Sequence, residues 1–144
     1  MTASTSVRPI GFVGLYLAFA LALVSTLGAL FIGEVLGQTP CVLCWYQRIA
    51  MFPLALILGI AALTEDLGAR RYALPLALAG GAVALWHSGL YAGLLPETVA
   101  PCTREGPSCT DTAMTILGLP IPYLSLAAFA SIVLSLLSAK GSRA

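Results

Sequence analysis

Charged residues divide this chain into four long runs that contain none of them. The runs cover residues 9–33, 49–64, 72–96 and 112–139. A helix that spans a membrane needs about 20 mostly apolar residues. The first and third runs have this length by themselves, and the second reaches it if its helix begins at Cys41. The pattern of apolar and charged positions therefore predicts membrane-spanning helices.

Two prolines set the expected start of the fourth helix. Pro120 and Pro122 suit the first turn of a helix but not its interior, so the helix is expected to begin at about Ile121. The expected helices cover about 9–34, 41–63, 72–95 and 121–139, with external loops at 35–40 and 96–120. We expect residues 1–144 to form a single membrane domain, an all-α bundle of four transmembrane helices.

The composition is typical of a membrane protein. Apolar residues make up 59% of the chain and charged residues 9%, against about 25% charged in ordinary soluble domains. The first apolar run is longer than the core of a cleavable signal peptide, which has about 7–15 residues. The first helix is therefore expected to remain as an anchor, and the short connections leave no room for a soluble domain.

Basic residues near the helix ends predict the orientation. With four spans, both termini lie on the same side of the membrane. That side would hold five basic residues, Arg8, Arg70, Arg71, Lys140 and Arg143, and the other only Arg48 and Arg104. Because basic residues accumulate on the cytoplasmic side, both termini are expected to be cytoplasmic. All four cysteines then lie near or beyond the outer surface, where disulfides persist.

A Cys-x-x-Cys motif followed by an arginine stands at the start of the second helix. Thr39 is the expected N-cap and Pro40 the first helical residue. At about 100° per residue, Cys41, Cys44 and Arg48 then fall within a stripe roughly 60° wide. Two sulfurs and a guanidinium are therefore predicted to share one face of the helix.

This arrangement favours a reactive cysteine pair. A helix N-terminus and a nearby cation both stabilise a thiolate over a thiol. Two other interpretations stay open, half of a structural zinc site and an inert buried pair. Zinc is disfavoured, because the chain has only four cysteines and one histidine, and the second cysteine pair has another spacing. We therefore expect no metal site.

Two polar side chains are predicted at similar depth in the outer half of the membrane. At about 1.5 Å per residue, Arg48 lies roughly 10 Å below Cys41, and His87 roughly 12 Å below the outer end of the third helix. Ionisable residues inside spans are costly and usually mark a site. The alternatives are that Arg48 extends to the membrane surface and that His87 bonds to another helix.

A second cysteine pair, Cys102 and Cys109, lies in the longest external loop. Six residues separate the two thiols, and the Gly106-Pro107 turn signal can bring them together. A small, exposed disulfide of this kind is easily reduced by another protein. The alternative is a static link within the loop.

Two dithiol pairs on the outer face suggest a relay that carries electrons from an external protein to the loop pair and then to the helix pair. Exchange by itself cannot dispose of the electrons, so a terminal acceptor is required. No haem, flavin or iron–sulfur motif is present. A quinone dissolved in the bilayer meets the need, and Arg48 and His87 could donate hydrogen bonds to its ring carbonyls.

The residues that carry this chemistry resemble a known family. The sequence PCVLCWYQRI at residues 40–49, the later cysteine pair and the sequence IPYLSL at 121–126 closely resemble the bacterial DsbB family of thiol–quinone oxidoreductases, particularly its short BdbC branch. The resemblance implies a multi-pass protein of the bacterial plasma (inner) membrane. It also implies a DsbA-like thioredoxin-fold partner and a quinone, either ubiquinone or menaquinone. Membrane lipid is the other expected partner, with no nucleic acid, and a monomer is expected to suffice.

Site roles follow from the same resemblance. The partner's thiol would attack Cys102, and Cys109 would resolve the mixed disulfide. Electrons would then pass to the Cys41–Cys44 disulfide, with Cys41 facing the loop pair and Cys44 facing the quinone. Arg48 matches the family's quinone-interacting arginine, and His87 its third-helix histidine.

Two related classes of membrane protein fit the cysteine pattern less well. Longer DsbB members have a larger second loop, so a direct disulfide between the two loops is in doubt for this chain. In vitamin K epoxide reductases the loop cysteines precede the Cys-x-x-Cys motif, which is the reverse of the order here.

The rival function is a soft-metal carrier that resembles the mercury-transport proteins. It would need soft ligands deeper in the bundle, yet no cysteine lies between Ile49 and Pro101.

Overall fold

The computed structural model describes residues 9–96 and 115–139. Its helices are α1 (Pro9–Leu30), the π-helix Phe31–Val35, α2 (Val42–Thr64), the 3₁₀ helix Leu67–Ala69, α3 (Arg70–Tyr91) and α4 (Ile121–Ser138). Two short strands, β1 (Thr115–Ile116) and β2 (Leu119–Pro120), precede α4. Four helices in this part of the chain are long and apolar enough to cross a membrane. The expected all-α membrane fold is confirmed.

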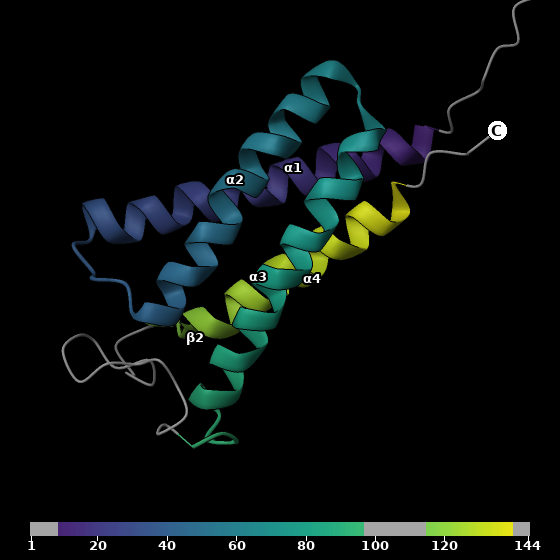
Figure 1. Ribbon diagram of the computed structural model, residues 1–144. Coiled ribbons are helices and arrows are strands. Elements are labelled where there is room, and N and C mark those ends of the chain that lie inside the picture. The colour runs from purple at the N-terminus through teal and green to yellow at the C-terminus, as the bar shows by residue number, and fades with distance from the viewer. Residues whose placement is uncertain (1–8, 97–114, 140–144) are drawn as a thin grey trace, which may run out of the picture.

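The four helices form a closed bundle. Helix α1 packs against α2 and α4, and α3 packs against the same two helices. Figure 1 shows the α2–α3 turn toward the end where α1 begins and α4 finishes, while the α1–α2 connection lies at the opposite end. Neighbours in sequence are therefore neighbours in space, and the α1–α2 connection, the end of α3 and the start of α4 lie at one end of the bundle.

Large apolar side chains from three of the helices fill the centre of the bundle. The largest buried ones are Leu15, Leu54, Leu58, Phe129, Ile132 and Leu136. Helix α3 contributes small residues, among them Ala73, Ala77 and Gly80. A Cβ atom on Gly80 would collide with the ring of Phe129, so the glycine lets α4 approach α3 closely.

The second helix begins later than expected. Thr39 is not its N-cap; Cys41 is, and its Sγ atom accepts a hydrogen bond from the backbone N–H of Cys44 at 3.3 Å. Sulfur is a poorer acceptor than the oxygen of threonine, which is why the sequence favoured Thr39. The cysteine pair therefore stands in the capping turn itself.

The third helix is displaced toward its start. It begins at Arg70, two residues before the expected position, and ends at Tyr91 instead of residue 95. Gly93 adopts a left-handed conformation with φ of 75°. The N–H groups of Gly93 and Leu94 donate to the carbonyls of Leu90 and Gly89, at 3.1 and 2.9 Å, which is the Schellman pattern that closes a helix.

The β1–β2 hairpin was not expected from the sequence. Its strands are antiparallel, and Ile116 pairs with Leu119. Leu117 and Gly118, which connect them, have φ of 52° and 80°, and two successive positive φ values are typical of a type I′ turn. Leucine is a rare residue there, so nothing in the sequence indicated the turn. The hairpin leads directly into α4 and adds Ile116 to the site described below.

Candidate active site

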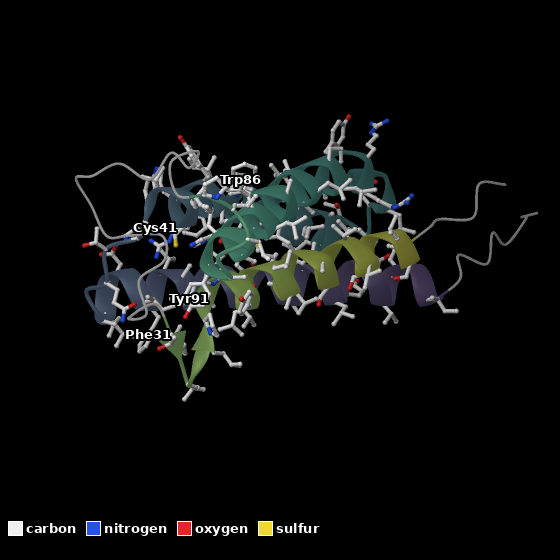
Figure 2. All side chains as sticks on the ribbon, turned by 90° about the horizontal axis from the view of Figure 1, so that it is seen from below. Phe31, Cys41, Trp86 and Tyr91 are labelled. Atoms are coloured by element: carbon white, nitrogen blue, oxygen red, sulfur yellow. The ribbon has the colours of Figure 1, made fainter. Side chains whose placement is uncertain are left out.

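Two cysteines occupy the first turn of α2. The sulfur atoms of Cys41 and Cys44 lie 2.8 Å apart, and both thiols are free. Cys41 is 1% exposed, whereas Cys44 is partly exposed. Figure 2 shows Cys41 near the end of the bundle where Phe31 and Tyr91 also lie. The two sulfurs are close enough to form a disulfide bond with little movement of the backbone.

The surroundings of Cys41, which precedes the spanning segment of α2, favour its thiolate. The side-chain hydrogen bond with Cys44 lowers the pKa of Cys41 most. Burial opposes this effect, while His87 and the backbone N–H of Cys44 add to it, and the pKa falls to about 4. A lowered pKa is the property of a thiol that attacks or leaves readily.

The reduced pair is expected to hold one thiolate at mildly acidic pH. An ordinary thiol with a pKa of about 8.5 is under about 1% thiolate at about pH 6, whereas Cys41 should be almost fully ionised. Since the folded pKa lies below the unfolded one, the thiolate stabilises the reduced protein above the unfolded pKa, and this is lost as the pH falls through about 4.

Thiolate absorbance in the far ultraviolet measures this ionisation directly. A reduced variant with Cys102→Ser and Cys109→Ser should show one thiolate per chain near pH 6. The same variant with Cys41→Ser is the control and should show none. Absorbance that rises only above about pH 8 would contradict the assignment.

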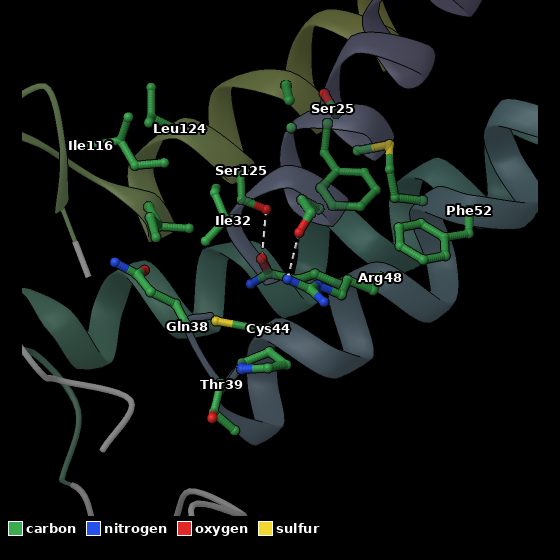
Figure 3. Close-up of a pocket in the computed structure, with 18 residues that line it drawn as sticks. Ser25, Ile32, Gln38, Thr39, Cys44, Arg48, Phe52, Ile116, Leu124 and Ser125 are labelled. Atoms are coloured by element: carbon green, nitrogen blue, oxygen red, sulfur yellow. Dashed lines mark hydrogen bonds between the residues drawn. The ribbon is translucent and has the colours of Figure 1, made fainter. Parts of the chain in front are cut away.

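A cavity of about 550 Å³ opens beside Cys44. Its wall comes from α1, the π-helix, the α1–α2 connection, α2, the hairpin and α4 (Figure 3), and among the helices of the bundle α3 alone adds no residue to it. The lining is largely apolar and includes Ile32, Met51, Phe52, Leu124, Ala128 and Phe129. The polar side chains in the wall include Gln47, Arg48 and Ser125, with the Cys44 sulfur beside them. Apolar walls with a few polar groups are typical of sites that bind small organic molecules.

Arg48 lies in the cavity wall one turn below Cys44. Its Nη2 atom donates a hydrogen bond to the carbonyl oxygen of Ala29 at 2.8 Å, which joins α2 to α1. The π-helix begins two residues after Ala29, and such wide turns often occur at functional sites. Gly33 in that turn leaves room for the guanidinium, because a Cβ atom there would lie 3.2 Å from Nη1. Arg48 therefore points toward α1 and the π-helix across the cavity wall.

Replacing Gly33 with alanine is expected to displace the guanidinium by a few tenths of an ångström. A longer hydrogen bond from Arg48 should weaken binding in the cavity by about threefold to tenfold, on the scale of part of one charged hydrogen bond. Equilibrium binding of a soluble quinone to the purified protein measures the effect. Gly81→Ala is the matched control, because Gly81 on α3 is not among the cavity residues and a Cβ atom there would make only an ordinary contact, 3.6 Å from Cβ of Phe129. Equal affinities in both variants would show that Gly33 does not position Arg48.

His87, on α3, lies away from the cavity and faces α2. It is fully buried; its Nε2 atom is 3.8 Å from the Cys41 sulfur, and its Nδ1 atom is 3.1 Å from Nε2 of Gln47. Gln47 in turn accepts a hydrogen bond from the Ser125 hydroxyl at 2.6 Å. The sequence placed Arg48 and His87 at one site because of their equal depth, but the structure assigns them to opposite sides of the cysteine pair.

Near His87 and Gln47, contacts with α3 hold α4 in register. The Ser88 hydroxyl donates to the carbonyls of Ala84 and Pro122, at 2.8 and 3.1 Å. The rings of Tyr91 and Tyr123 meet edge to face with centroids 5.6 Å apart. These contacts between α3 and α4 fix the height of Ser125 relative to His87.

One group of described residues could hold a metal ion. Ligand atoms of Cys41, Cys44 and His87 lie within 4.8 Å of one another. A tetrahedral zinc ion with bonds of about 2.3 Å would hold two sulfurs roughly 3.8 Å apart. The observed separation is 2.8 Å, so the pair would have to open before it could bind zinc. The geometry suits the exchange of a sulfur–sulfur bond better than a preformed metal site.

The structure brings Cys41, Cys44, Arg48 and His87 into one region, whereas Cys102 and Cys109 lie outside the described residues. Sequence reasoning missed Gln47 and Ser125. Gln47 could have been found, because it is a polar residue inside a spanning helix, the same signal that drew attention to Arg48. Serine is too common in membrane helices to be noticed without the contact.

Comparisons with known proteins agree on one family. Residues 13–139 match the model of the disulfide bond formation protein DsbB family. A probable disulfide formation protein of Metapseudomonas resinovorans is 54% identical over 123 residues, covering 85% of each chain. One from Deinococcus radiodurans is 43% identical and covers 86% of each. Disulfide bond formation protein C of Bacillus subtilis is 36% identical over 90% of this chain and 94% of its own. No solved structure matches the chain significantly.

Proposed function

Because the chain belongs to the DsbB family, and is thus a membrane oxidoreductase of disulfide bond formation, we propose that it reoxidises a DsbA-like thioredoxin-fold protein outside the cytoplasm. The two electrons pass through its cysteine pairs to a quinone in the membrane. The observation that carries the proposal is a shared wall: Cys44 and Arg48 line the same largely apolar cavity of about 550 Å³.

Electrons and bonds balance along the proposed path. The partner's two thiols form a disulfide as the Cys102–Cys109 disulfide is reduced. The reduced loop pair then reduces the Cys41–Cys44 disulfide, so that every sulfur–sulfur bond formed replaces one that is broken. Cys41 receives the loop thiol, and Cys44 is released toward the cavity. A quinone, when bound, supplies the acceptor of two electrons and two protons that returns Cys41 and Cys44 to the disulfide.

The cavity residues fit the head group of a quinone. Phe52 and Phe129 are among the apolar residues available to a flat ring, and a guanidinium is a strong donor to a carbonyl oxygen that gains charge. Arg48 already donates to a neutral carbonyl, that of Ala29, and the guanidinium has five N–H donors in all. Exclusion of water by the apolar wall would strengthen this interaction.

The remaining features of the proposal concern location. We place both termini in the cytoplasm and the cysteines at the outer face of a bacterial plasma (inner) membrane, in agreement with Arg70 and Arg71 at the α2–α3 turn. Both cysteine pairs lie in one chain of 144 residues that we treat as a single membrane domain. A monomer is therefore sufficient for the proposed relay.

Anaerobic mixing tests this function. Purified, oxidised protein is mixed with a reduced thioredoxin-fold donor and a soluble quinone, and quinone absorbance is followed against donor thiols consumed. One quinone should be reduced for each pair of thiols lost. Absence of quinone reduction, together with tight uptake of a soft metal by the reduced protein, would favour the carrier function instead.

A further inference from the structure

A chain of polar side chains, buried except at its partly exposed Ser125 end, joins the cysteine pair to the cavity wall. It runs from Cys41 to His87 on α3, from His87 to Gln47 on α2, and from Gln47 to Ser125 on α4. His87 is fully buried and Gln47 is 6% exposed. Burying polar groups is costly unless they are hydrogen-bonded, so the orientation of each group in the chain matters.

The Ser125–Gln47 contact fixes which way the amide of Gln47 points. The hydroxyl and the amide oxygen are 2.6 Å apart, a distance typical of O–H···O bonds and shorter than most N–H···O bonds. The hydroxyl therefore donates to Oε1. The amide nitrogen then faces His87, with its N–H directed at Nδ1, 3.1 Å away.

This orientation selects one form of the imidazole. Because Gln47 donates to Nδ1, that nitrogen must accept, and the ring proton is carried on Nε2. Nε2 is the atom 3.8 Å from the Cys41 sulfur, a distance suited to a hydrogen bond to the larger sulfur atom. The N–H group is thus directed at Cys41, where it stabilises a thiolate and does not accept the proton of a thiol.

We propose that Gln47 and Ser125 are positioning residues, which hold His87 with its proton on Nε2 so that the imidazole stabilises Cys41 as the leaving thiolate of the relay. The step concerned is the release of Cys41. The bond between Cys41 and a loop sulfur breaks, the loop disulfide forms, and Cys41 keeps the electron pair, while the proton of the second loop thiol goes to solvent. Exchange is faster when the leaving thiolate is more stable. The role of His87 in turnover rests on the proposed function, whereas the position of its ring proton does not.

Nitrogen NMR identifies which ring nitrogen of His87 carries the proton. The signal is unambiguous, because His87 is the only histidine of the chain. Protein labelled with ¹⁵N-histidine, reduced and free of quinone and donor, should show the proton on Nε2. Gln47→Met removes the amide at similar volume and should release this preference. Ser125→Ala should weaken it, and Ser125→Thr, which keeps the hydroxyl, should restore it. Ser131→Ala is the matched control, because the Ser131 hydroxyl donates within α4, to the carbonyl of Ala127.

Thiolate titration supplies the second measurement. In a background with Cys44→Ser, Cys102→Ser and Cys109→Ser, ultraviolet absorbance reports Cys41 alone. Gln47→Met should raise its pKa by roughly one unit, the scale of one hydrogen bond to a charged form. Ser125→Ala should give a smaller rise that Ser125→Thr reverses.

Three results would overturn the proposal: a proton on Nδ1 in the unaltered protein, a Cys41 titration that does not change in Gln47→Met, or an Ser125→Thr variant that behaves like Ser125→Ala. Thermal unfolding of each variant shows whether it folds. If Gln47→Met does not fold, the milder Ser125 variants test the proposal. Neither measurement uses quinone or donor. Failure here therefore leaves the proposed function standing, and failure of quinone reduction leaves this inference standing.

Discussion

Replacement of Cys44 with serine is expected to abolish quinone reduction. Cys44 is the cysteine that lines the cavity, while the Cys41 sulfur faces His87. Serine keeps the shape of the side chain but can neither form a disulfide with Cys41 nor release a thiolate at neutral pH. The anaerobic rate of quinone reduction should fall by on the order of 10³-fold or more, the scale of losing a reacting nucleophile.

Two further measurements make the Cys44→Ser result specific. Quinone binding should be retained, because Arg48 and the apolar wall are unchanged. A Ser25→Ala variant, which alters another polar residue of the same wall, is the matched control and should reduce quinone at a rate close to that of the unaltered protein. Quinone reduction that persists in Cys44→Ser would exclude Cys44 as the residue that delivers electrons.

Replacement of Arg48 with alanine is expected to weaken quinone use selectively. Among the described residues, the guanidinium is the only charged group that lines the cavity, so its removal takes away the donor best placed for a reduced ring. The quinone concentration needed for half-maximal rate should rise by about 10–100-fold, which corresponds to one charged hydrogen bond. Exchange of the cysteine pairs with the thioredoxin-fold partner should change little.

The control variants separate charge from geometry. Arg48→Lys keeps the charge but loses the planar fork that reaches Ala29, so an intermediate loss is expected. Arg71→Ala removes a cation outside the cavity, one that stacks on Tyr72 at 4.8 Å, and should leave the quinone dependence unchanged. Equal loss of partner exchange and quinone use in Arg48→Ala would show a structural role for Arg48.

The spans were predictable from the sequence because charges are excluded from the membrane interior. That constraint acts on whole segments and says little about their ends. The start of α2 depended on whether an oxygen or a sulfur caps the helix, and the end of α3 on the left-handed conformation of Gly93. Each outcome reflects a small energy difference that the hydrophobic pattern does not contain.

The site was predictable only in part. The stripe of Cys41, Cys44 and Arg48 follows from helical geometry and is local in sequence. The position of His87 is not local, because depth in the membrane does not specify which neighbour a side chain faces. Its place is set by two contacts with α2, to Cys41 and Gln47. The pairing of Cys102 and Cys109 remains a prediction, outside the described residues.

The capping role of Cys41 links the folding of α2 to its redox chemistry. The same sulfur accepts the N–H of Cys44 and takes part in the proposed exchange, so each change of partner at this atom also loosens or restores the first turn of the helix. Cys41→Ala would remove both roles together, at a cost of about 1 kcal/mol for a lost cap. Cys41→Ser keeps a capping oxygen and removes only the chemistry. The loss of stability in Cys41→Ala relative to the unaltered, reduced protein would measure how much the helix depends on its own sulfur atom.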